Sequence, residues 1–274
     1  MADQVARESS AAFGGRPAGQ PILQMRGIGK HFGAVRALNN VDFEVYPGEV
    51  VALVGDNGAG KSTLVKAISG VQPADEGEVF VNGQQVTLSS PQTSNRLGIE
   101  TVYQDLALCD NLDVVSNLFL GHELNTATVL SEIEMERRSL EVLRTLDVKL
   151  PSARAIVSTL SGGQRQSIAV AKTILRNAKV VLLDEPTAAL GVAQTRQVLN
   201  LIRRLREQGL GVVVISHSMA DVFEVADRII VMRLGQRVAA FDANTTTNER
   251  VIAAITGAEF GKSASNGNGV PGGK

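Results

Sequence analysis

The segment at residues 55–62, Gly-Asp-Asn-Gly-Ala-Gly-Lys-Ser, constrains the fold more than any other part of the chain. Apolar residues fill positions 50–54 before it, and a short helical pattern follows Lys61 and ends at Gly70. A strand, a glycine-rich turn and a helix in this order form a phosphate-binding loop, in which backbone N–H groups and the helix N-terminus attract phosphate oxygens. An ordinary glycine turn is the alternative, and the flanking strand and helix argue against it.

This loop is predicted to bind a nucleoside triphosphate together with Mg²⁺. Lys61 would bridge the β- and γ-phosphates, and the hydroxyl of Ser62 would be a magnesium ligand. The nucleotide-binding residues expected in the loop are Gly55, Asp56, Asn57, Gly58, Ala59, Gly60, Lys61, Ser62 and Thr63.

Two acidic residues, Asp184 and Glu185, directly follow an apolar run at 180–183. Ligands of open α/β sheets bind at the carboxyl ends of the strands, where this run would place both side chains. Asp184 is predicted to hold Mg²⁺ directly or through water, and Glu185 to orient and polarise an attacking water as a general base. A solvated strand end is the alternative, which the upstream phosphate loop disfavours.

The fold class is predicted to be α/β. Continuous apolar runs at 180–183 and 212–215 flank a helical stretch at 192–206 that Gly209 ends, a pattern typical of a parallel sheet buried on both faces. Further strands are expected at 22–25, 41–45, 50–54, 78–81 and 84–86, with Asn82-Gly83 as a hairpin turn, and a hairpin at 229–240 precedes a helix at 248–255.

The chain of 274 residues can hold one large domain with a lobe inserted into it. The middle, about 92–176, is predicted to be a helical subdomain, because Leu140, Leu143 and Leu146 recur at helical spacing. Residues 1–20 are expected to be a disordered arm and residues 258–274, which are polar and glycine-rich, a disordered tail. The ordered domain is therefore expected at 21–257.

Composition narrows the class of protein. The chain has 27 basic and 28 acidic residues, which gives no reason to expect a nucleic-acid or acidic-lipid surface. The single cysteine, Cys109, excludes a disulfide within the chain and fits a reducing compartment. Neither a secretory signal nor an apolar run of the roughly 18–20 residues that span a bilayer is recognised, so we expect a soluble chain.

A second glycine-rich element, Leu-Ser-Gly-Gly-Gln-Arg-Gln, occupies residues 160–166. Ser161 and Gln164 have the spacing of a helix capping box, and Ile168, Ala171, Ile174 and Leu175 give the following helix an apolar face. A well-capped helix is the alternative interpretation, but a cap does not need two adjacent glycines, whereas close approach of backbone to an anion does. The helix after Lys61 already binds phosphate, so this element indicates a nucleotide held by another copy of the chain.

In this order the motifs resemble those of the ATP-binding cassette (ABC) ATPases, and the resemblance covers nearly all of residues 21–256. It implies an ATPase with a phosphate-loop, RecA-like core, an antiparallel β-subdomain and an inserted α-helical subdomain. It also implies that residues 160–166 are the signature motif, which closes over the γ-phosphate of ATP held by the opposite subunit. The contacting residues would be Ser161, Gly162, Gly163 and Gln164.

The resemblance assigns three more positions. Gln104 falls at the Q-loop, which touches Mg²⁺ and the attacking water and senses the transmembrane partner, and His217 falls at the switch position beside the γ-phosphate. Phe32 matches the aromatic that stacks on adenine; a core phenylalanine is its alternative, as a structural histidine is for His217. The expected catalytic residues are thus Lys61, Gln104, Glu185 and His217, and the expected magnesium ligands are Ser62, Gln104 and Asp184.

The chain departs from the family pattern after Glu185. The segment at 188–191 is Ala-Ala-Leu-Gly, so Gly191 stands where many relatives carry an aspartate. Without that side chain, coupling between two nucleotide sites would rely on backbone there.

Segments at 90–105, 111–121 and 185–191 resemble the cassettes of bacterial monosaccharide importers of the ribose, xylose and fructose type. The resemblance implies a homodimer bound to transmembrane permease subunits at the cytoplasmic face of the membrane. A periplasmic or lipoprotein sugar-binding protein would be an indirect partner, and no nucleic acid is expected. The binding protein and the membrane subunits would select the sugar.

Other classes fit less well. A cassette ATPase of chromosome maintenance needs a long coiled coil between Lys61 and Leu160, and this interval is too short. A translation factor would carry two cassettes and a basic linker, and a phosphate-loop kinase has no need of residues 161–164. A cassette for amino acids or lipids is the alternative that the sequence leaves open.

Overall fold

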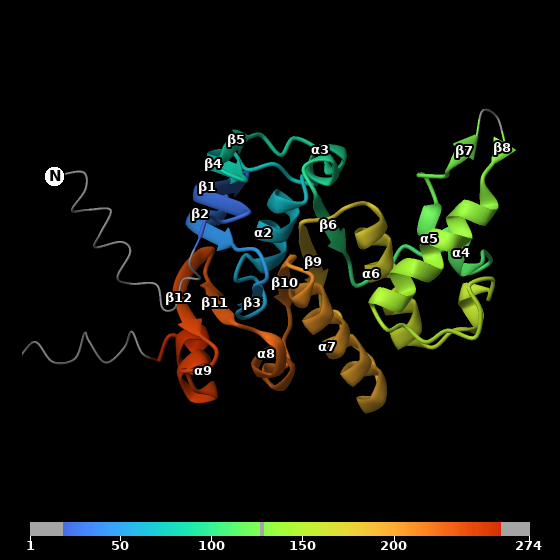
Figure 1. Cartoon of the computed structure of the whole chain (residues 1–274). Helices are drawn as coiled ribbons and strands as arrows, with labels where there is room; N and C mark the ends of the chain where they lie inside the picture. The colour runs from blue at the N-terminus through green and yellow to red at the C-terminus, as the bar shows by residue number, and fades with distance from the viewer. Residues whose placement is uncertain (1–18, 127–128, 259–274) are drawn as a thin grey trace, which may run out of the picture.

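The computed structural model describes residues 19–126 and 129–258 (Figure 1). The predicted arm, apart from residues 19 and 20, lies outside the described residues, as does the predicted tail apart from residue 258. The domain limits of 21–257 therefore remain a prediction.

An antiparallel sheet of four strands forms one layer of the protein, in the order β2-β1-β4-β5. Its strands are β1 (Leu23–Phe32), β2 (Val35–Val45), β4 (Glu76–Val81) and β5 (Gln84–Val86). Asn82 and Gly83 join the last two strands with φ values of 50° and 77°. Both residues tolerate positive φ, so the predicted hairpin turn is confirmed.

The second sheet forms the centre of the molecule, in the order β12-β11-β3-β10-β9-β6. Its strands are β3 (Val50–Val54), β6 (Ile99–Val102), β9 (Val180–Asp184), β10 (Gly211–Ile215), β11 (Arg228–Arg233) and β12 (Gln236–Asp242). The pairings are parallel except that of β11 with β12. Every residue of β3 and β10 is buried, because both faces of the sheet are covered. The predicted α/β class is confirmed.

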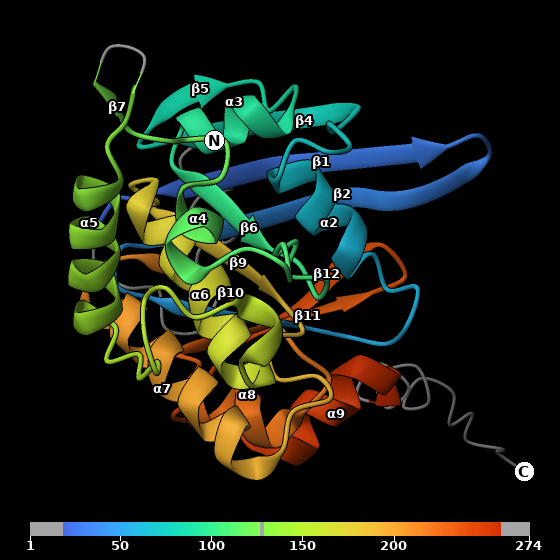
Figure 2. The same cartoon turned by 90° about the vertical axis from the view of Figure 1, so that its right-hand side faces the viewer.

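Helices cover both faces of this central sheet (Figure 2). On one face, α2 (Lys61–Ile68) packs in a shared apolar core with both sheets. On the other, α7 (Val192–Glu207), α8 (Met219–Val225) and α9 (Asn248–Thr256) pack in two further cores. Alternation along β10 shows this division, since Val213 and Ile215 belong to the first core and Val212 and Val214 to the second.

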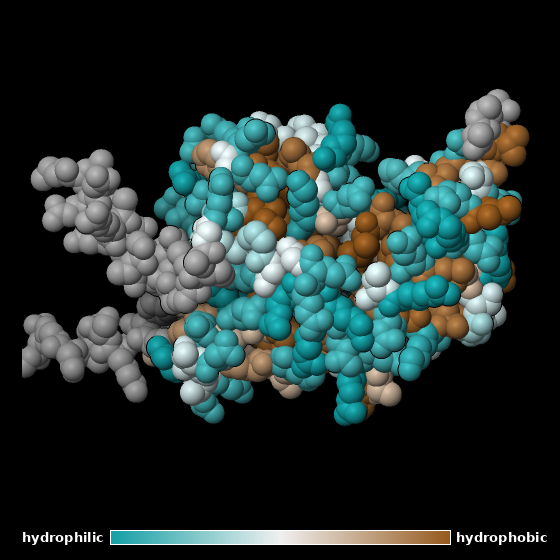
Figure 3. Space-filling view, viewed as in Figure 1, coloured by the Kyte–Doolittle hydropathy of each residue, from teal (hydrophilic) through white to brown (hydrophobic). Residues whose placement is uncertain are grey.

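A helical lobe extends from one end of the central sheet, on the right in Figure 1. It contains α4 (Val114–Phe119), α5 (Glu132–Thr145), the 3₁₀ turn Val157–Thr159 and the N-terminal part of α6 (Gly162–Leu175), with α3 (Pro91–Arg96) preceding it. A two-stranded ribbon of β7 (Asn125–Thr126) and β8 (Val129–Leu130) ends the lobe. Figure 3 shows hydrophobic residues at this end, where Val129, Leu130 and Ile133 are exposed.

The prediction that about 92–176 is a helical subdomain is wrong at residues 99–102, which form β6 and pair in parallel with β9 at the edge of the central sheet. This strand of four residues contains Glu100 and Thr101, so it lacks the apolar run that marks its neighbours. The carboxylate of Glu100 is buried and accepts a hydrogen bond from the guanidinium of Arg176 at 3.3 Å. Only the tertiary structure supplies that partner. In α5, Leu143 is buried but Leu140 is exposed, and Leu146 follows the helix rather than belonging to it.

A buried ion-pair group ties the central sheet to the antiparallel sheet. The guanidinium of Arg228, in β11, is 1% exposed and donates to Glu49 Oε1 at 2.7 Å and to Glu44 Oε1 at 3.2 Å. A buried cation of this kind is stable only when paired and hydrogen-bonded. The pairing joins β11 to β2 and to Glu49, the residue before β3.

Among residues 19–126 and 129–258, no helix has the length and apolar character that crossing a bilayer requires.

Candidate functional site

The phosphate loop connects β3 to α2, as the sequence predicts. Gly55, Gly58 and Gly60 have φ values of 148°, 77° and 101°, which an L side chain rarely adopts. The ammonium of Lys61, the first residue of α2, donates to the carbonyls of Gly55 at 2.6 Å and Asp56 at 2.9 Å. The loop thus wraps around a lysine whose side chain is nearly buried.

Two of these glycines are also required by packing. A Cβ on Gly60 would lie 2.9 Å from the carbonyl oxygen of Ala37, and one on Gly55 would collide with the carbonyl oxygen of Met232. The loop is therefore pressed against β2 on one side and β11 on the other. Its shape is set by the sheets as well as by any ligand that it holds.

A cleft of about 530 Å³ opens beside the loop. It brings together residues from five regions of the sequence: the β1–β2 hairpin, the phosphate loop, the end of β9, the end of β10 with the segment after it, and the β11–β12 turn. The predicted site residues that line it are Phe32, Asn57, Gly58, Ala59, Gly60, Lys61, Ser62, Thr63, Asp184, Glu185 and His217. Gly55 and Asp56 are next to the cleft, because their carbonyls accept hydrogen bonds from Lys61, which lines it.

The acidic pair lies at the carboxyl end of β9, as predicted. Glu185 has a φ of 47°, and its backbone N–H donates to the carbonyl of Ile215 at 2.9 Å, which aligns it with the end of β10. Its Oε1 lies 3.1 Å from Nε2 of His217. Both side chains are partly exposed to the cleft, so a carboxylate and an imidazole face the same space with a proton-transfer distance between them.

Burial and charge shift the pKa values of Lys61 and Asp184 in opposite directions. Burial lowers the pKa of the Lys61 ammonium, although Glu185, Asp56 and Asp184 nearby act to raise it. Burial also raises the pKa of the Asp184 carboxyl, and the negative charge of Glu185 adds to this rise. A cation placed beside Asp184 would stabilise the ionised form of this carboxyl.

Phe32 is not a core residue. Its side chain is 44% exposed, it lines the cleft, and the ammonium of Lys30 lies 5.7 Å from its ring centroid. The alternative of a buried structural phenylalanine is therefore wrong, and the aromatic ring forms part of the cleft wall.

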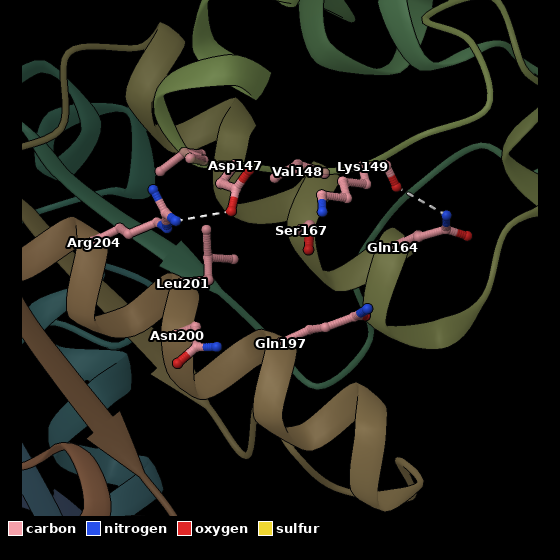
Figure 4. A pocket seen from close by; sticks show the side chains of 10 residues that line it. Asp147, Val148, Lys149, Gln164, Ser167, Gln197, Asn200, Leu201 and Arg204 are labelled. Atoms are coloured by element: carbon pink, nitrogen blue, oxygen red, sulfur yellow. Dashed lines mark hydrogen bonds and ion pairs between the residues drawn. The ribbon is translucent and has the colours of Figure 1, made fainter.

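The signature segment begins α6 with the predicted capping box. The hydroxyl of Ser161 accepts from the backbone N–H of Gln164 at 3.3 Å, and Oε1 of Gln164 accepts from the N–H of Ser161 at 2.9 Å. Figure 4 shows the amide of Gln164 also donating to the carbonyl of Lys149, at 3.1 Å, and Arg204 of α7 paired with Asp147 at 2.9 Å. The first contact anchors the signature helix to the loop that follows α5, and the second anchors α7 to the same loop.

The structure does not bring every predicted residue into one cleft. Residues 161–164 do not line the cleft beside the phosphate loop. Gln104 lies in a neighbouring cleft of about 300 Å³ that also contains Gly162, Arg165 and Glu185. Glu185 thus borders both spaces, and it is the point at which the phosphate-loop cleft meets the helical lobe.

Some residues of the cleft gave no signal in the sequence. Leu234 and Gly235, in the turn between β11 and β12, line it beside Arg36 and Ala37 of β2. Gly235 donates through its backbone N–H to the carbonyl of Ala59 at 3.0 Å, so this turn is hydrogen-bonded to the phosphate loop. Such contacts arise only when distant strands are neighbours in the sheet.

Comparison with known proteins agrees with this geometry. The model of the ABC transporter family matches residues 38–188, which include the phosphate loop, the signature segment and the acidic pair. This chain belongs to the ABC transporter family. As a member it is an ATPase that binds ATP.

Curated relatives are similar over most of the chain. The fructose import ATP-binding protein FrcA of Rhizobium meliloti is 45% identical over 248 residues, which cover 88% of this chain and 95% of the relative. The xylose/arabinose import ATP-binding protein XylG of Sulfolobus acidocaldarius is 44% identical over 241 residues, covering 88% and 96%. The ribose import ATP-binding protein RbsA 1 of Rubrobacter xylanophilus is 42% identical, and this chain spans only 46% of it.

Solved ABC cassettes share the fold. The ADP form of MJ1267, an ATP-binding cassette of an ABC transporter, superposes with a TM-score of 0.76 at 26% identity, covering 90% of this chain and all of that chain. A dimeric post-hydrolysis state of the cassette MJ0796 with ADP and Pi gives a TM-score of 0.67 at 26% identity, covering 81% and 98%. The MJ0796 cassette is dimeric in that structure, and the predicted antiparallel, parallel and helical parts of this chain are those of the ABC ATPase fold.

Proposed function

We propose that this ABC ATPase powers the import of a monosaccharide as a homodimer whose two copies share two ATP molecules. The observation that carries the sharing is the separation of the two glycine-rich elements within one chain. The phosphate loop lines one cleft, whereas residues 161–164 lie outside it at the N-terminus of α6. A helix N-terminus favours an anion, so a second chain can present this one to the γ-phosphate. The dimeric MJ0796 cassette supports the arrangement.

In the proposed site, Lys61 transfers its hydrogen bonds from the loop carbonyls to the β- and γ-phosphates. Glu185 accepts a proton from the attacking water, and His217, 3.1 Å from the carboxylate, orients it and contacts the γ-phosphate. Gln104, in the neighbouring cleft with Glu185, completes the water's surroundings and links them to the membrane subunits. Ser161, Gly162, Gly163 and Gln164 of the other copy stabilise the phosphate charge.

The donor set also fits Mg²⁺. Ser62 and Asp184 line the same cleft and offer hard oxygen ligands, and Mg²⁺ is commonly bound by one or two protein oxygens together with substrate phosphates. Gln104 would be a further ligand. When bound, Mg²⁺ neutralises charge that develops on the β- and γ-phosphate oxygens. A cation beside Asp184 would also offset the burial that raises the pKa of this carboxyl.

Coupling between the two sites would run through backbone at Gly191. This residue precedes the first turn of α7, and its N–H donates to Oε1 of Gln194 at 3.2 Å. It offers no carboxylate to a partner copy.

We expect the adenine ring to stack on Phe32. Replacing it in Phe32→Ala should raise the Kd for ATP about tenfold, because stacking of a base on an aromatic side chain contributes roughly 1–3 kcal/mol. Isothermal titration with ATP measures this, and Phe80→Ala, in β4 of the same sheet but away from the cleft, is the matched control. Equal affinities in the two variants would remove Phe32 from the site.

The substrate proposal rests on the fructose and xylose/arabinose relatives, which this chain matches over nearly their whole length. The chain would act at the cytoplasmic face of the membrane, bound to permease subunits that receive a sugar from a periplasmic or lipoprotein binding protein. The sugar itself is selected by those partners.

Uptake assays test the proposal. Deletion of the gene should abolish uptake of one radiolabelled monosaccharide from a panel of fructose, xylose and ribose, while uptake of amino acids continues. Wild-type protein should restore uptake, and Glu185→Gln should not. Normal sugar uptake with a loss of amino-acid or lipid uptake would reject a sugar importer and leave the ATPase assignment intact.

A further inference from the structure

Two segments carry the proposed catalytic pair. Glu185 begins the loop that follows β9, and His217 lies in the segment that connects β10 to α8. The N–H of Glu185 donates to the carbonyl of Ile215, and this hydrogen bond lies at the end of the pairing between β9 and β10. Beyond it the segments separate, so the 3.1 Å contact between Glu185 and His217 depends on whatever holds them together there.

The loop after Glu185 does not adopt a conformation that its residues prefer. Glu185 and Ala189 have φ values of 47° and 58°, which are unfavourable for residues with a Cβ. Local hydrogen bonds from Ala188 N–H to the Glu185 carbonyl and from Leu190 N–H to the Thr187 carbonyl tighten the turn. A turn of this kind persists only when its surroundings hold it.

A hydrogen bond from Thr187 to Asp221, called the tie below, holds this turn to the segment that follows β10. The hydroxyl of Thr187 donates to Oδ2 of Asp221 at 2.7 Å, and the contact is partly buried. Asp221 is in the first turn of α8, where the N–H of the same residue donates to the hydroxyl of Ser218 at 3.4 Å. A hydrogen bond to a carboxylate is stronger than one between neutral groups, and a helix N-terminus favours the negative charge.

The tie therefore joins the same two segments as the Glu185–His217 contact. All four side chains border one cleft of about 370 Å³, which lies next to the phosphate-loop cleft and shares Glu185 and His217 with it. Thr187 is two residues after the carboxylate, and Asp221 is four residues after the histidine.

We propose that Thr187 and Asp221 are positioning residues for ATP hydrolysis, whose hydrogen bond holds Glu185 and His217 in register. The proposal rests on the roles assigned to Glu185 and His217 under the proposed function. Neither residue lines the phosphate-loop cleft, so their loss changes the alignment of the water-activating groups and not the contacts with nucleotide.

The test compares steady-state hydrolysis and ATP affinity of the full chain in a set of variants. Thr187→Val keeps the shape and removes the hydroxyl, and it should lower kcat about tenfold with the KM and Kd for ATP unchanged within twofold. Thr187→Ser, which keeps the hydroxyl, should retain most of the wild-type kcat. Thr195→Val, the same substitution on α7 in the same cleft, is the matched control and should behave as wild type.

Asp221→Ala should show the same loss as Thr187→Val, and the double variant should be no slower than either single variant, since both remove one interaction. Thermal melting checks that each variant is folded. If a larger change unfolds the chain, Thr187→Ser and Asp221→Asn, each of which keeps one polar group, are measured in its place. A wild-type kcat in Thr187→Val, or losses that multiply in the double variant, would overturn the proposal.

Glu185→Gln in the same assay separates this proposal from the one on which it rests. If Glu185→Gln hydrolyses ATP at the wild-type rate, the assignment of the water-activating carboxylate is wrong. If Glu185→Gln is inactive and Thr187→Val is normal, only the positioning role fails.

Discussion

Glu185→Gln is expected to bind ATP with wild-type affinity and to hydrolyse it about 1000-fold more slowly than the wild type. Glutamine has nearly the same shape and can still contact His217, so the 3.1 Å geometry at the end of β9 is kept. It cannot accept a proton, and the attacking water loses its base. Phosphate release measured against time, with ATP affinity from titration, checks both parts.

The same variant should accumulate as a dimer when ATP is present, because hydrolysis is what would reopen the two copies. Size-exclusion chromatography with light scattering, with and without ATP, reports the change. Glu207→Gln, at the exposed C-terminal end of α7, is the matched control and should hydrolyse ATP normally. Wild-type turnover in Glu185→Gln would remove this carboxylate from the mechanism.

Lys61→Ala is expected to lose nucleotide binding as well as hydrolysis. Lys61 is 6% exposed at the first turn of α2, and its ammonium donates into the loop at the position expected for the phosphates. Charge-assisted hydrogen bonds to phosphate contribute roughly 1.5–3 kcal/mol each, so the Kd for ATP should rise about 100-fold. Titration with ATP measures the loss.

The controls for Lys61 must separate binding from loop structure, because the lysine also holds the carbonyls of Gly55 and Asp56. Lys66→Ala removes an exposed lysine from the last turn of the same helix and should leave the Kd for ATP unchanged. A thermal melt shows whether Lys61→Ala remains folded. A folded Lys61→Ala that binds ATP as the wild type does would contradict the phosphate role.

The parts of the fold that could be predicted from the sequence are those specified locally. The phosphate loop, the Asn82-Gly83 turn and the capping box of Ser161 and Gln164 each depend on residues a few positions apart. The strands β3, β9 and β10 could also be predicted, because burial on both faces of the sheet requires a continuous run of apolar residues.

Features that depend on distant partners could not be predicted in this way. Strand β6 contains Glu100, whose burial depends on Arg176, 76 residues away. The side of the cleft formed by Leu234 and Gly235 depends on β11 lying next to β3. The hydrogen bond between Thr187 and Asp221 likewise joins segments that meet only in the folded sheet.

For the site, sequence reasoning identified the chemistry better than the geometry. Lys61, Ser62, Asp184, Glu185 and His217 were expected together, and the structure places them around one cleft. Gln104 was expected beside the same nucleotide, yet it lies in the neighbouring cleft, whereas residues 161–164, expected at the nucleotide of another copy, lie outside the phosphate-loop cleft of their own chain. This separation is what makes a second copy of the chain necessary to the proposed mechanism.

If two copies share each ATP, one chain binds ATP but two chains are needed to hydrolyse it. The direct test measures the ATPase rate per chain over a dilution series of wild-type protein, with sedimentation recording how much of the chain is dimeric at each concentration in the presence of ATP. The rate per chain should fall in proportion to the dimer fraction, while monomers still bind ATP. A rate per chain that stays constant in samples containing only monomers would contradict the shared site.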